Sequence, residues 1–170
     1  MQPQWIPLSR TEAAPAEAVD RFVEQLAQGQ VVALPTETCF GLAIRGDRSE
    51  AIQRLAEIKG RPADRVFTWH LGDGDSVLDW APWKALTGRL IQAYWPGPLT
   101  LVLPIDASQA ASRGLVHIVQ RDTVGVRVPQ HAAVQSILSA ADFPVLMTSA
   151  NVSGQDPLRS AQEVAQTFGD

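Results

Sequence analysis

Apolar residues recur along this chain in two spacings, which together predict an alternation of helices and strands. Between Pro15 and Gly29 they recur every three or four positions, as on the core-facing side of a helix. Ser49 is expected to cap a second helix, and Ser160 with Glu163 has the spacing of a capping box for the last one. The same periodicity predicts the remaining helices, giving segments at 49–59, 86–94, 134–141 and 160–168.

Continuous or alternating apolar runs predict the strands. The run at 31–34 is closed by Pro35, which favours a short strand buried on both faces. Between 123 and 128 three valines alternate with Gly125 and Arg127, so the valines face the core and Arg127 faces the other side. Further strands are expected at 66–71, 99–103 and 145–147, with a turn at 72–75 and a loop-rich connection at 105–121.

The order of these elements indicates an α/β protein, because helices and strands alternate and only some strands are consecutive. The chain has 170 residues, of which 45% are hydrophobic and 19% are charged, so it is long enough to bury one substantial core. It contains no internal repeat, low-complexity segment or linker. We therefore expect a single domain over residues 1–170.

Composition excludes several classes of protein. The net charge of −4 argues against a globally basic nucleic-acid binder, although 45–65 holds six Lys or Arg against four Asp or Glu. The lone Cys39 excludes an internal disulfide, and three scattered histidines give no zinc-ligand spacing. No apolar run approaches the length of a membrane span, and the first residues lack a signal-peptide pattern. A cytoplasmic protein without membrane contact is expected.

Polar residues gather where the first predicted strand and the second predicted helix end. Thr36 and Thr38 follow the strand, whereas Lys59 and Arg61 flank the glycine that follows the helix. A lysine is a mobile point charge and an arginine a planar fork, so together they suit a polyphosphate and would neutralise pyrophosphate as it leaves. The alternatives are a solvated helix end for the cations and ordinary turn chemistry for the threonines.

Three further polar positions carry candidate chemistry. Ser149 and Asn151 follow the last predicted strand, where they offer hydroxyl and amide groups to a phosphate or a base, or else form a turn. Arg127 either pairs with an acid at the sheet surface or projects into a crevice to bind a carboxylate. His70, at the exit of its strand, either hydrogen-bonds a substrate or is structural.

Common nucleotide and hydrolase motifs are missing from the sequence. It holds neither the Gly-x-x-x-x-Gly-Lys-Ser/Thr loop of many nucleotide-binding proteins nor the Gly-x-Ser-x-Gly elbow of many hydrolases. Any nucleotide binding must therefore use another arrangement. No metal held by the protein is predicted, beyond a Mg²⁺ carried by phosphates.

Five segments nevertheless occur in the order of a known family. They are Pro-Thr-Glu-Thr-Cys-Phe-Gly-Leu at 35–42, Lys-Gly-Arg-Pro at 59–62, Trp-Pro-Gly-Pro-Leu-Thr at 95–100, Thr-Val-Gly-Val-Arg-Val-Pro at 123–129, and 148–154. Through them the chain resembles the YrdC-like threonylcarbamoyl-AMP synthases, in their short bacterial-type form. The resemblance implies a three-layer α/β fold with a twisted mixed sheet and flanking helices around a deep concave cavity. It also implies that the closing C-terminal segment of typical members is absent after Asp170.

The resemblance further implies an activity. Such proteins use ATP, L-threonine and bicarbonate to make threonylcarbamoyl-adenylate and pyrophosphate, and a partner threonylcarbamoyl transferase complex then modifies tRNA. By position, threonine binding is implied for Thr38, His70, Arg127 and Ser149. Nucleotide binding is implied for Lys59, Arg61, Thr123, Ser149 and Asn151, with catalytic roles for Lys59 and Arg61.

One alternative function remains open on the sequence alone. The local basic excess at 45–65 would also suit a structured-RNA-binding module of the same fold, which contacts duplex RNA or tRNA during ribosome or tRNA maturation. The acidic net charge favours the enzyme. Lys59 and Arg61 are expected to be solvent-accessible, so that replacing either by Ala weakens ATP use and leaves folding intact.

Overall fold

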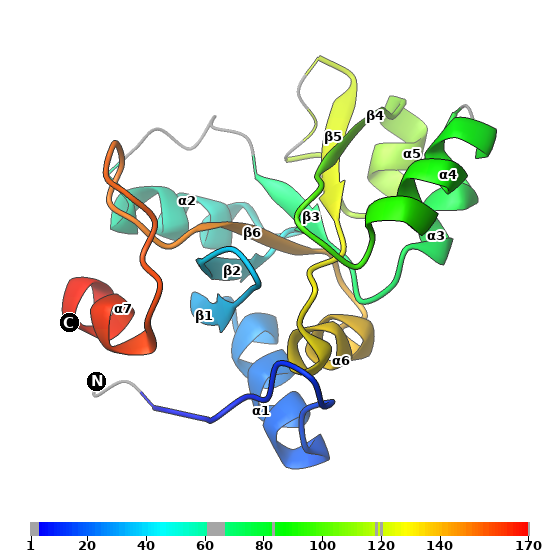
Figure 1. Ribbon diagram of the computed structural model, residues 1–170. Coiled ribbons are helices and arrows are strands. Elements are labelled where there is room, and N and C mark those ends of the chain that lie inside the picture. The colour runs from blue at the N-terminus through cyan, green and yellow to red at the C-terminus, as the bar shows by residue number, and fades with distance from the viewer. Residues whose placement is uncertain (1–3, 61–66, 83, 118, 120, 170) are drawn as a thin grey trace.

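The computed structural model describes residues 4–60, 67–82, 84–117, 119 and 121–169 (Figure 1). Its strands are β1 Val32–Pro35, β2 Phe40–Arg45, β3 Thr68–His70, β4 Leu101–Pro104, β5 Thr123–Arg127 and β6 Val145–Ser149. Its helices are α1 Ala16–Ala27, α2 Ser49–Ile58, α3 Asp75–Leu78, α4 Lys84–Tyr94, α5 Ala107–Ser112, α6 Ala132–Ala140 and α7 Ala161–Phe168.

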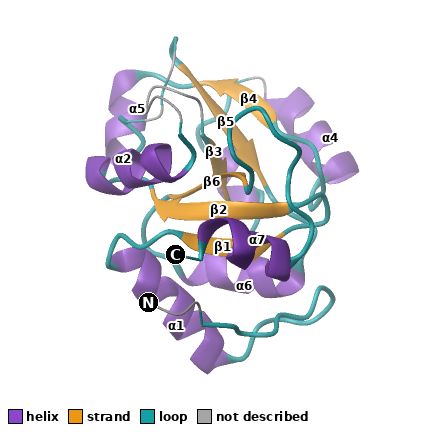
Figure 2. Cartoon of the chain, turned by 90° about the vertical axis from the view of Figure 1, so that its left-hand side faces the viewer, coloured by secondary structure: helices purple, strands orange, loops and turns teal. Residues whose placement is uncertain are grey.

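The six strands form one mixed sheet in the order β1-β2-β6-β3-β5-β4. Only the pair β3 and β5 is parallel, and the four other neighbouring pairs are antiparallel. The strand direction rotates progressively from β1 to β5, which gives the sheet a strong twist (Figures 1 and 2). The predicted α/β class and twisted mixed sheet are confirmed.

Helices cover both faces of the sheet and make three layers. α1 and α6 lie together beneath β1, β2 and β6 (Figure 1), where their apolar residues pack on Leu34, Ala43 and Met147. On the other face, Ile52 and Leu55 of α2 pack in a larger cluster, which also holds apolar residues of α3, α4 and α5. Burying each such side chain contributes about 1.5–3 kcal/mol, so the two cores hold the layers together.

Helix ends were predictable where a local signal fixes them. α1 is followed by Gly29 with φ +78° and α2 by Gly60 with φ +60°, as the glycine positions predicted. Ser160 and Glu163 form the predicted capping box of α7. The prediction for Ser49 was wrong, because Arg48 takes the N-cap position and Ser49 is already the first helical residue.

Two strand predictions failed for a tertiary reason. β1 is not buried on both faces: it lies at the edge of the sheet, and only Leu34 within it is buried. The sequence analysis assigned no strand at 40–45, yet β2 runs there between β1 and β6, with four consecutive buried residues. The apolar residues of β2 directly follow the polar turn at 36–39, with no break between them. The sequence analysis therefore did not separate them from that turn. The 105–121 connection also contains α5, capped by Asp106.

Within the described part of the chain no helix is long and apolar enough to cross a lipid bilayer. Across those same residues, no three or more His, Cys, Asp or Glu side chains are grouped so that they could hold a metal ion.

Candidate functional site

The register of the sheet places most of the predicted site residues on one face. Thr68 of β3 is paired with Gly125 of β5 on one side and with Met147 of β6 on the other. Because paired residues point to the same face and side chains alternate along a strand, residues two positions away lie on that face as well. The shared face therefore carries His70, Thr123, Arg127 and Ser149. The valines of β5 point to the opposite core, as predicted.

Lys59, Ser149 and Asn151, here the Lys59 cluster, meet where α2 and β6 end. The Lys59 Nζ donates to the Ser149 carbonyl oxygen at 2.5 Å and to Asn151 Oδ1 at 2.8 Å. The Ser149 hydroxyl donates to the same Oδ1 at 2.7 Å. The Asn151 amide in turn donates to the carbonyl oxygens of Val152 and Gln155, which holds the loop after β6 in shape.

The burial of Lys59 contradicts the prediction that it is solvent-accessible. Only 1% of the residue is exposed. The cause is the loop after β6, about ninety positions away in sequence, whose oxygens receive the ammonium group; the Lys59 carbonyl also accepts from the Ser153 amide at 3.3 Å. Buried lysines persist only where acceptors replace water, so Lys59 joins α2 to this loop. Arg61, its predicted companion, lies outside the described residues.

A second group, here the Arg127 cluster, comprises Arg127, Glu37, Thr38 and His70. The Arg127 Nη2 forms an ion pair with Glu37 and donates to the Thr38 hydroxyl at 3.2 Å. The Arg127 Nε donates to the Gly97 carbonyl oxygen at 3.2 Å. Sequence reasoning left open whether Arg127 pairs with an acid or faces a crevice, and here it pairs with an acid on the site face.

Glu37 belongs to the Arg127 cluster although the sequence analysis did not name it as a candidate site residue. Burial alone would raise the pKa of its carboxyl, but hydrogen bonds from Arg127 and from backbone amides, together with the Arg127 charge, outweigh burial and lower that pKa. The carboxyl is therefore ionised at neutral pH. The available signal was its place between two threonines directly after a strand.

The turn that presents Glu37 and Thr38 is organised by Thr36. The Thr36 hydroxyl donates to the Cys39 carbonyl oxygen at 2.7 Å and accepts from the backbone amides of Thr38 and Cys39 at 3.2 Å each. This is the turn chemistry that the sequence favoured for the threonines. Thr38 differs, because its hydroxyl reaches Arg127 across the sheet.

His70 lies beside Arg127 in the parallel β3–β5 pair and is 7% exposed. Desolvation, reinforced by the Arg127 charge, lowers the pKa of His70 to about 4, although the Thr68 carbonyl and Glu37 oppose this shift. The imidazole is therefore neutral at pH 7. Its Nδ1 lies 3.0 Å from the Thr68 carbonyl oxygen, which only accepts, so Nδ1 carries the proton. The Nε2 lone pair is then an acceptor for a substrate hydroxyl or amine.

Thr123 occupies the opposite end of β5 from Arg127, on the same face. Four residues of strand separate the two positions by about 13 Å, a distance that a nucleotide or an extended substrate spans. The described site therefore has two groups of polar side chains rather than a single cluster, and they share the sheet face through Arg127 and His70 in one group and Ser149 in the other.

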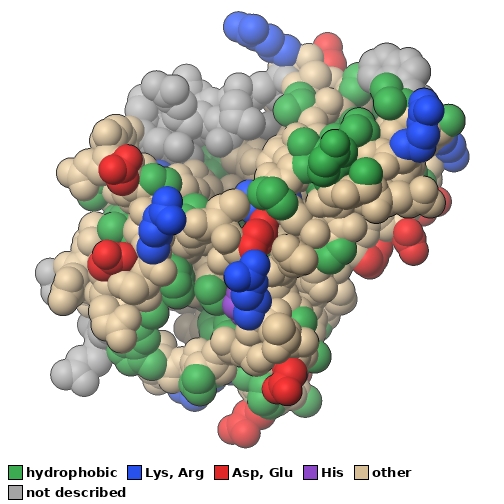
Figure 3. Space-filling view, in the orientation of Figure 1, with side chains coloured by type: hydrophobic (Ala, Val, Ile, Leu, Met, Phe, Trp, Pro, Cys, Tyr) green, Lys and Arg blue, Asp and Glu red, His purple; other side chains and the backbone are tan. Residues whose placement is uncertain are grey.

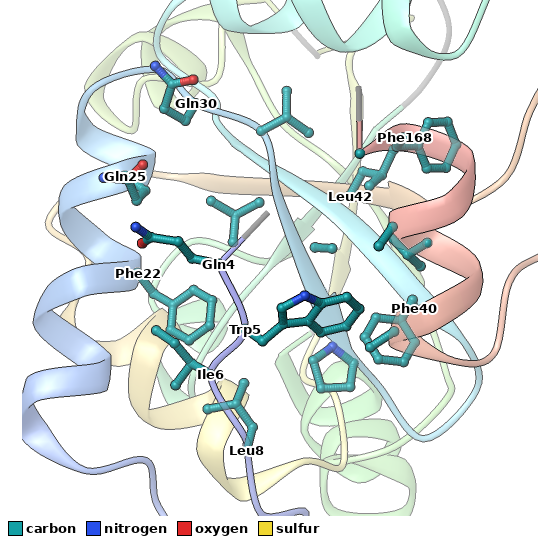
Figure 4. Close-up of a pocket in the computed structure, with 18 of the residues that line it drawn as sticks. Gln4, Trp5, Ile6, Leu8, Phe22, Gln25, Gln30, Phe40, Leu42 and Phe168 are labelled. Atoms are coloured by element: carbon teal, nitrogen blue, oxygen red, sulfur yellow. The ribbon is translucent and has the colours of Figure 1, made fainter. Parts of the chain in front are cut away.

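One cavity lies away from both clusters. It measures about 920 Å³ and lies between the N-terminal segment, α1, the outer edge of β1 and α7, where Trp5, Phe22 and Phe168 point into it (Figure 4). Of the predicted site residues that the structure describes, none lines this cavity. Its lining mixes apolar side chains with polar ones such as Gln4, Gln25 and Gln30, but the hydrogen-bonded Lys59 and Arg127 clusters lie outside it, so these clusters are the better candidate for chemistry.

The surface gives no support to an extended nucleic-acid interface on the face drawn in Figure 3. Lys and Arg side chains there are separated from one another and interspersed with Asp and Glu side chains. Duplex binding relies on a continuous basic patch that neutralises several phosphates. Part of the predicted basic segment, 61–65, lies outside the described residues.

Comparisons with known proteins identify the family of this chain. The sequence model of the Sua5/YciO/YrdC family, described as "Telomere recombination", matches residues 24–170. The chain is 37% identical over 154 residues to a protein of Vibrio vulnificus strain YJ016 named threonylcarbamoyl-AMP synthase, covering 89% of this chain and 81% of that protein.

Two solved structures of P. abyssi Sua5 share the fold. One is the H234A/Y235A variant, with a TM-score of 0.79, and the other is complexed with L-threonine, with a TM-score of 0.75; both are 32% identical to this chain. They cover 96% and 95% of this chain, whereas the chain spans only 49% and 47% of theirs, about half their length.

Proposed function

This chain belongs to the Sua5/YciO/YrdC family, and we propose that it is a threonylcarbamoyl-AMP synthase, which converts L-threonine, bicarbonate and ATP into L-threonylcarbamoyl-adenylate and pyrophosphate. The observation that carries the proposal is the sheet face shared by Arg127, the neutral His70 and Ser149, with Thr38 bonded to Arg127 and with Lys59 and Asn151 bonded to Ser149. The P. abyssi Sua5 structure with L-threonine supports the choice of amino acid.

The Arg127 cluster suits the amino acid. Arg127 binds the carboxylate of threonine, because a guanidinium donates charge-assisted hydrogen bonds to carboxylates. The Thr38 hydroxyl lies next to it, and the neutral His70 accepts from the amine or the hydroxyl of the substrate. Ser149 lies on the same sheet face and would contact both the amino acid and the nucleotide.

The Lys59 cluster, with Thr123 and Arg61, suits the nucleotide. The Ser149 hydroxyl and the Asn151 amide offer directional groups to a phosphate or a base. Because Lys59 is buried beneath them, it acts on the nucleotide through their positions and through its charge rather than as an exposed phosphate ligand. ATP brings its Mg²⁺ on its phosphates.

The chemistry requires positioning more than a covalent nucleophile. The deprotonated amine of threonine adds to carbon dioxide from bicarbonate, which forms an N–C bond and releases a proton. A carbamate oxygen then attacks the α-phosphorus of ATP, and the bond to the β-phosphate breaks with its electron pair leaving on pyrophosphate. Holding the two reactants in line supplies much of the rate in such reactions.

The product is a reactive mixed anhydride, so a second enzyme has to consume it quickly. We place this chain in the cytoplasm, where a threonylcarbamoyl transferase complex would use the product to modify tRNA.

Release of pyrophosphate tests the proposal. The protein with ATP and bicarbonate is expected to release pyrophosphate only when L-threonine is added, and mass spectrometry should detect threonylcarbamoyl-adenylate. Release that does not depend on threonine, or no release at all, would contradict it. A steep salt-dependent affinity for duplex RNA without pyrophosphate release would instead favour the RNA-binding alternative.

A further inference from the structure

Glu37 is buried and hydrogen-bonded through both of its carboxylate oxygens. Its side chain is 6% exposed, less than the 14% of Arg127. One carboxylate oxygen accepts from the Arg127 Nη2, and the other accepts from the backbone amide of Gln130 at 2.9 Å. Both oxygens are therefore engaged, one by β5 and one by the chain just before α6.

The same contacts determine which part of Arg127 a ligand can meet. Nε donates to the Gly97 carbonyl oxygen, and Nη2 donates to both Glu37 and the Thr38 hydroxyl. Nε and Nη2 form one edge of the planar guanidinium, and that edge is turned toward the protein. Within the described part of the chain, Nη1 makes no hydrogen bond, so its two N–H groups are the donors that remain for a substrate.

We propose that Glu37 is a positioning residue for amino-acid recognition: it fixes the orientation of the Arg127 guanidinium so that Nη1 faces the carboxylate of the substrate. This inference rests on the proposed function. Glu37 acts through Arg127 and needs no contact with the substrate itself.

Displacement of Glu37 by the substrate carboxylate is the less favourable alternative. A carboxylate that is 6% exposed would keep only the Gln130 amide if Arg127 were withdrawn, and removing one partner of a buried ion pair is strongly destabilising. The substrate therefore binds beside the Glu37–Arg127 pair and does not replace it.

Glu37→Gln is the sharpest test, because it keeps the shape of the side chain. Its single carbonyl oxygen can accept from Arg127 or from the Gln130 amide but not from both, and its NH₂ group then faces a donor. Losing one charge-assisted hydrogen bond at Arg127 corresponds to about a tenfold effect. We expect the KM for threonine to rise about tenfold and the KM for ATP to stay within about twofold.

A second measurement does not depend on turnover. In ¹⁵N-labelled protein, solvent exchange of the Arg127 Nε–H is expected to be about tenfold faster in Glu37→Gln than in the wild type, since the guanidinium is no longer held. Glu37→Asp keeps the charge and should restore part of both effects.

The chain offers a matched control in its second described ion pair, Arg45–Asp47, at 2.5 Å. Asp47→Asn makes the same carboxylate-to-amide change and should lower the Tm without altering either KM or the Arg127 exchange rate. Unchanged threonine KM and unchanged Arg127 exchange in Glu37→Gln would overturn the inference. A parallel loss in both KM values and kcat would also overturn it, since that indicates a purely structural role.

Failure of the proposed function remains distinguishable from failure of this inference. If the wild type releases no pyrophosphate with threonine, the proposed function fails. The Arg127 Nε–H exchange rate then decides the positioning role by itself: faster exchange in Glu37→Gln supports it, and an unchanged rate overturns it.

Discussion

The Lys59 and Arg127 clusters each hold a cation, but they hold it differently. Lys59 is 1% exposed, and its ammonium contacts a backbone carbonyl and an amide oxygen of the loop after β6. Arg127 contacts a carboxylate, a hydroxyl and a carbonyl while 14% of its side chain stays exposed. Under the proposed function, we therefore expect Lys59 to shape a loop that contacts a ligand and Arg127 to contact a ligand itself.

This difference changes what a mutation at each cation reports. A change at Lys59 tests how much the contacts between the end of α2 and the loop after β6 stabilise the fold. It is expected to affect nucleotide binding only indirectly. A change in the Arg127 cluster tests recognition, because the guanidinium edge that contacts the protein and the edge that is left for a ligand are distinct.

Lys59→Met is expected to have the largest effect. Methionine fills most of the volume but leaves the Ser149 carbonyl and Asn151 Oδ1 without their ammonium donor, at about 1–3 kcal/mol each. We expect the free energy of unfolding to fall by about 4 kcal/mol, as measured by urea denaturation, and the KM for ATP to rise. Arg54→Met, an exposed cation on the same helix, is the control and should stay within about 0.5 kcal/mol. A Lys59→Met protein as stable as the wild type would remove the contrast between the clusters.

The pH dependence of stability addresses the Arg127 cluster. The folded pKa of His70 is about 4, below its ordinary value of 6.5, so between these values the unfolded state binds the proton and the folded state does not. Stability from this group is complete above pH 6.5 and is lost as the pH falls toward 4, by about 3 kcal/mol in total.

His70→Asn should remove this slope between pH 6.5 and 4, as measured by denaturation at each pH. The exposed His117→Asn should leave the slope unchanged. His131, whose pKa burial also lowers, is present in both variants, so the difference isolates His70. An identical slope in wild type and His70→Asn would mean that His70 is not neutral and desolvated.

Arg127→Lys tests the geometry of the guanidinium at constant charge. A lysine can reach Glu37 but cannot also donate to Gly97 and Thr38 while it keeps a planar edge for the substrate. We expect the KM for threonine to rise about 100-fold, which corresponds to about 2.7 kcal/mol, with a much smaller change for ATP. Equal losses for both substrates in steady-state assays would show that the two clusters do not divide recognition.

The parts of this molecule that the sequence predicted well are those fixed by neighbouring residues. α1 ends near Gly29, and α7 begins at the capping box of Ser160, because the signals lie within a few positions. The alternation in β5 correctly put the valines on the core side and Arg127 on the other. The family resemblance supplied the candidate site residues, which stay a prediction, and local pattern could not show their contacts.

The parts that could not be predicted depend on residues far apart in the sequence. Lys59 follows a helix and looks exposed, yet the loop that buries it is about ninety residues away. Glu37 looks like a turn residue, and its partner Arg127 is equally distant. β1 was expected in the interior because its run is apolar, but strand order decides burial, and the order puts it at the edge.

Gly97→Ala is expected to have the smallest effect, and it probes how Arg127 is held from the other side. An added Cβ at Gly97 would lie 2.3 Å from the Tyr94 carbonyl oxygen, a backbone atom that cannot move aside easily. The loop must then shift, and with it the Gly97 carbonyl that accepts from the Arg127 Nε. One weakened hydrogen bond to a charged group predicts a three- to tenfold rise in the KM for threonine. Gly88→Ala in α4, where an added Cβ would lie 3.9 Å from Leu78, is the matched control and should change neither KM. If Gly97→Ala raised the KM for ATP instead, the Arg127 cluster would bind the nucleotide. The assignment of the two clusters to threonine and ATP would then have to be exchanged.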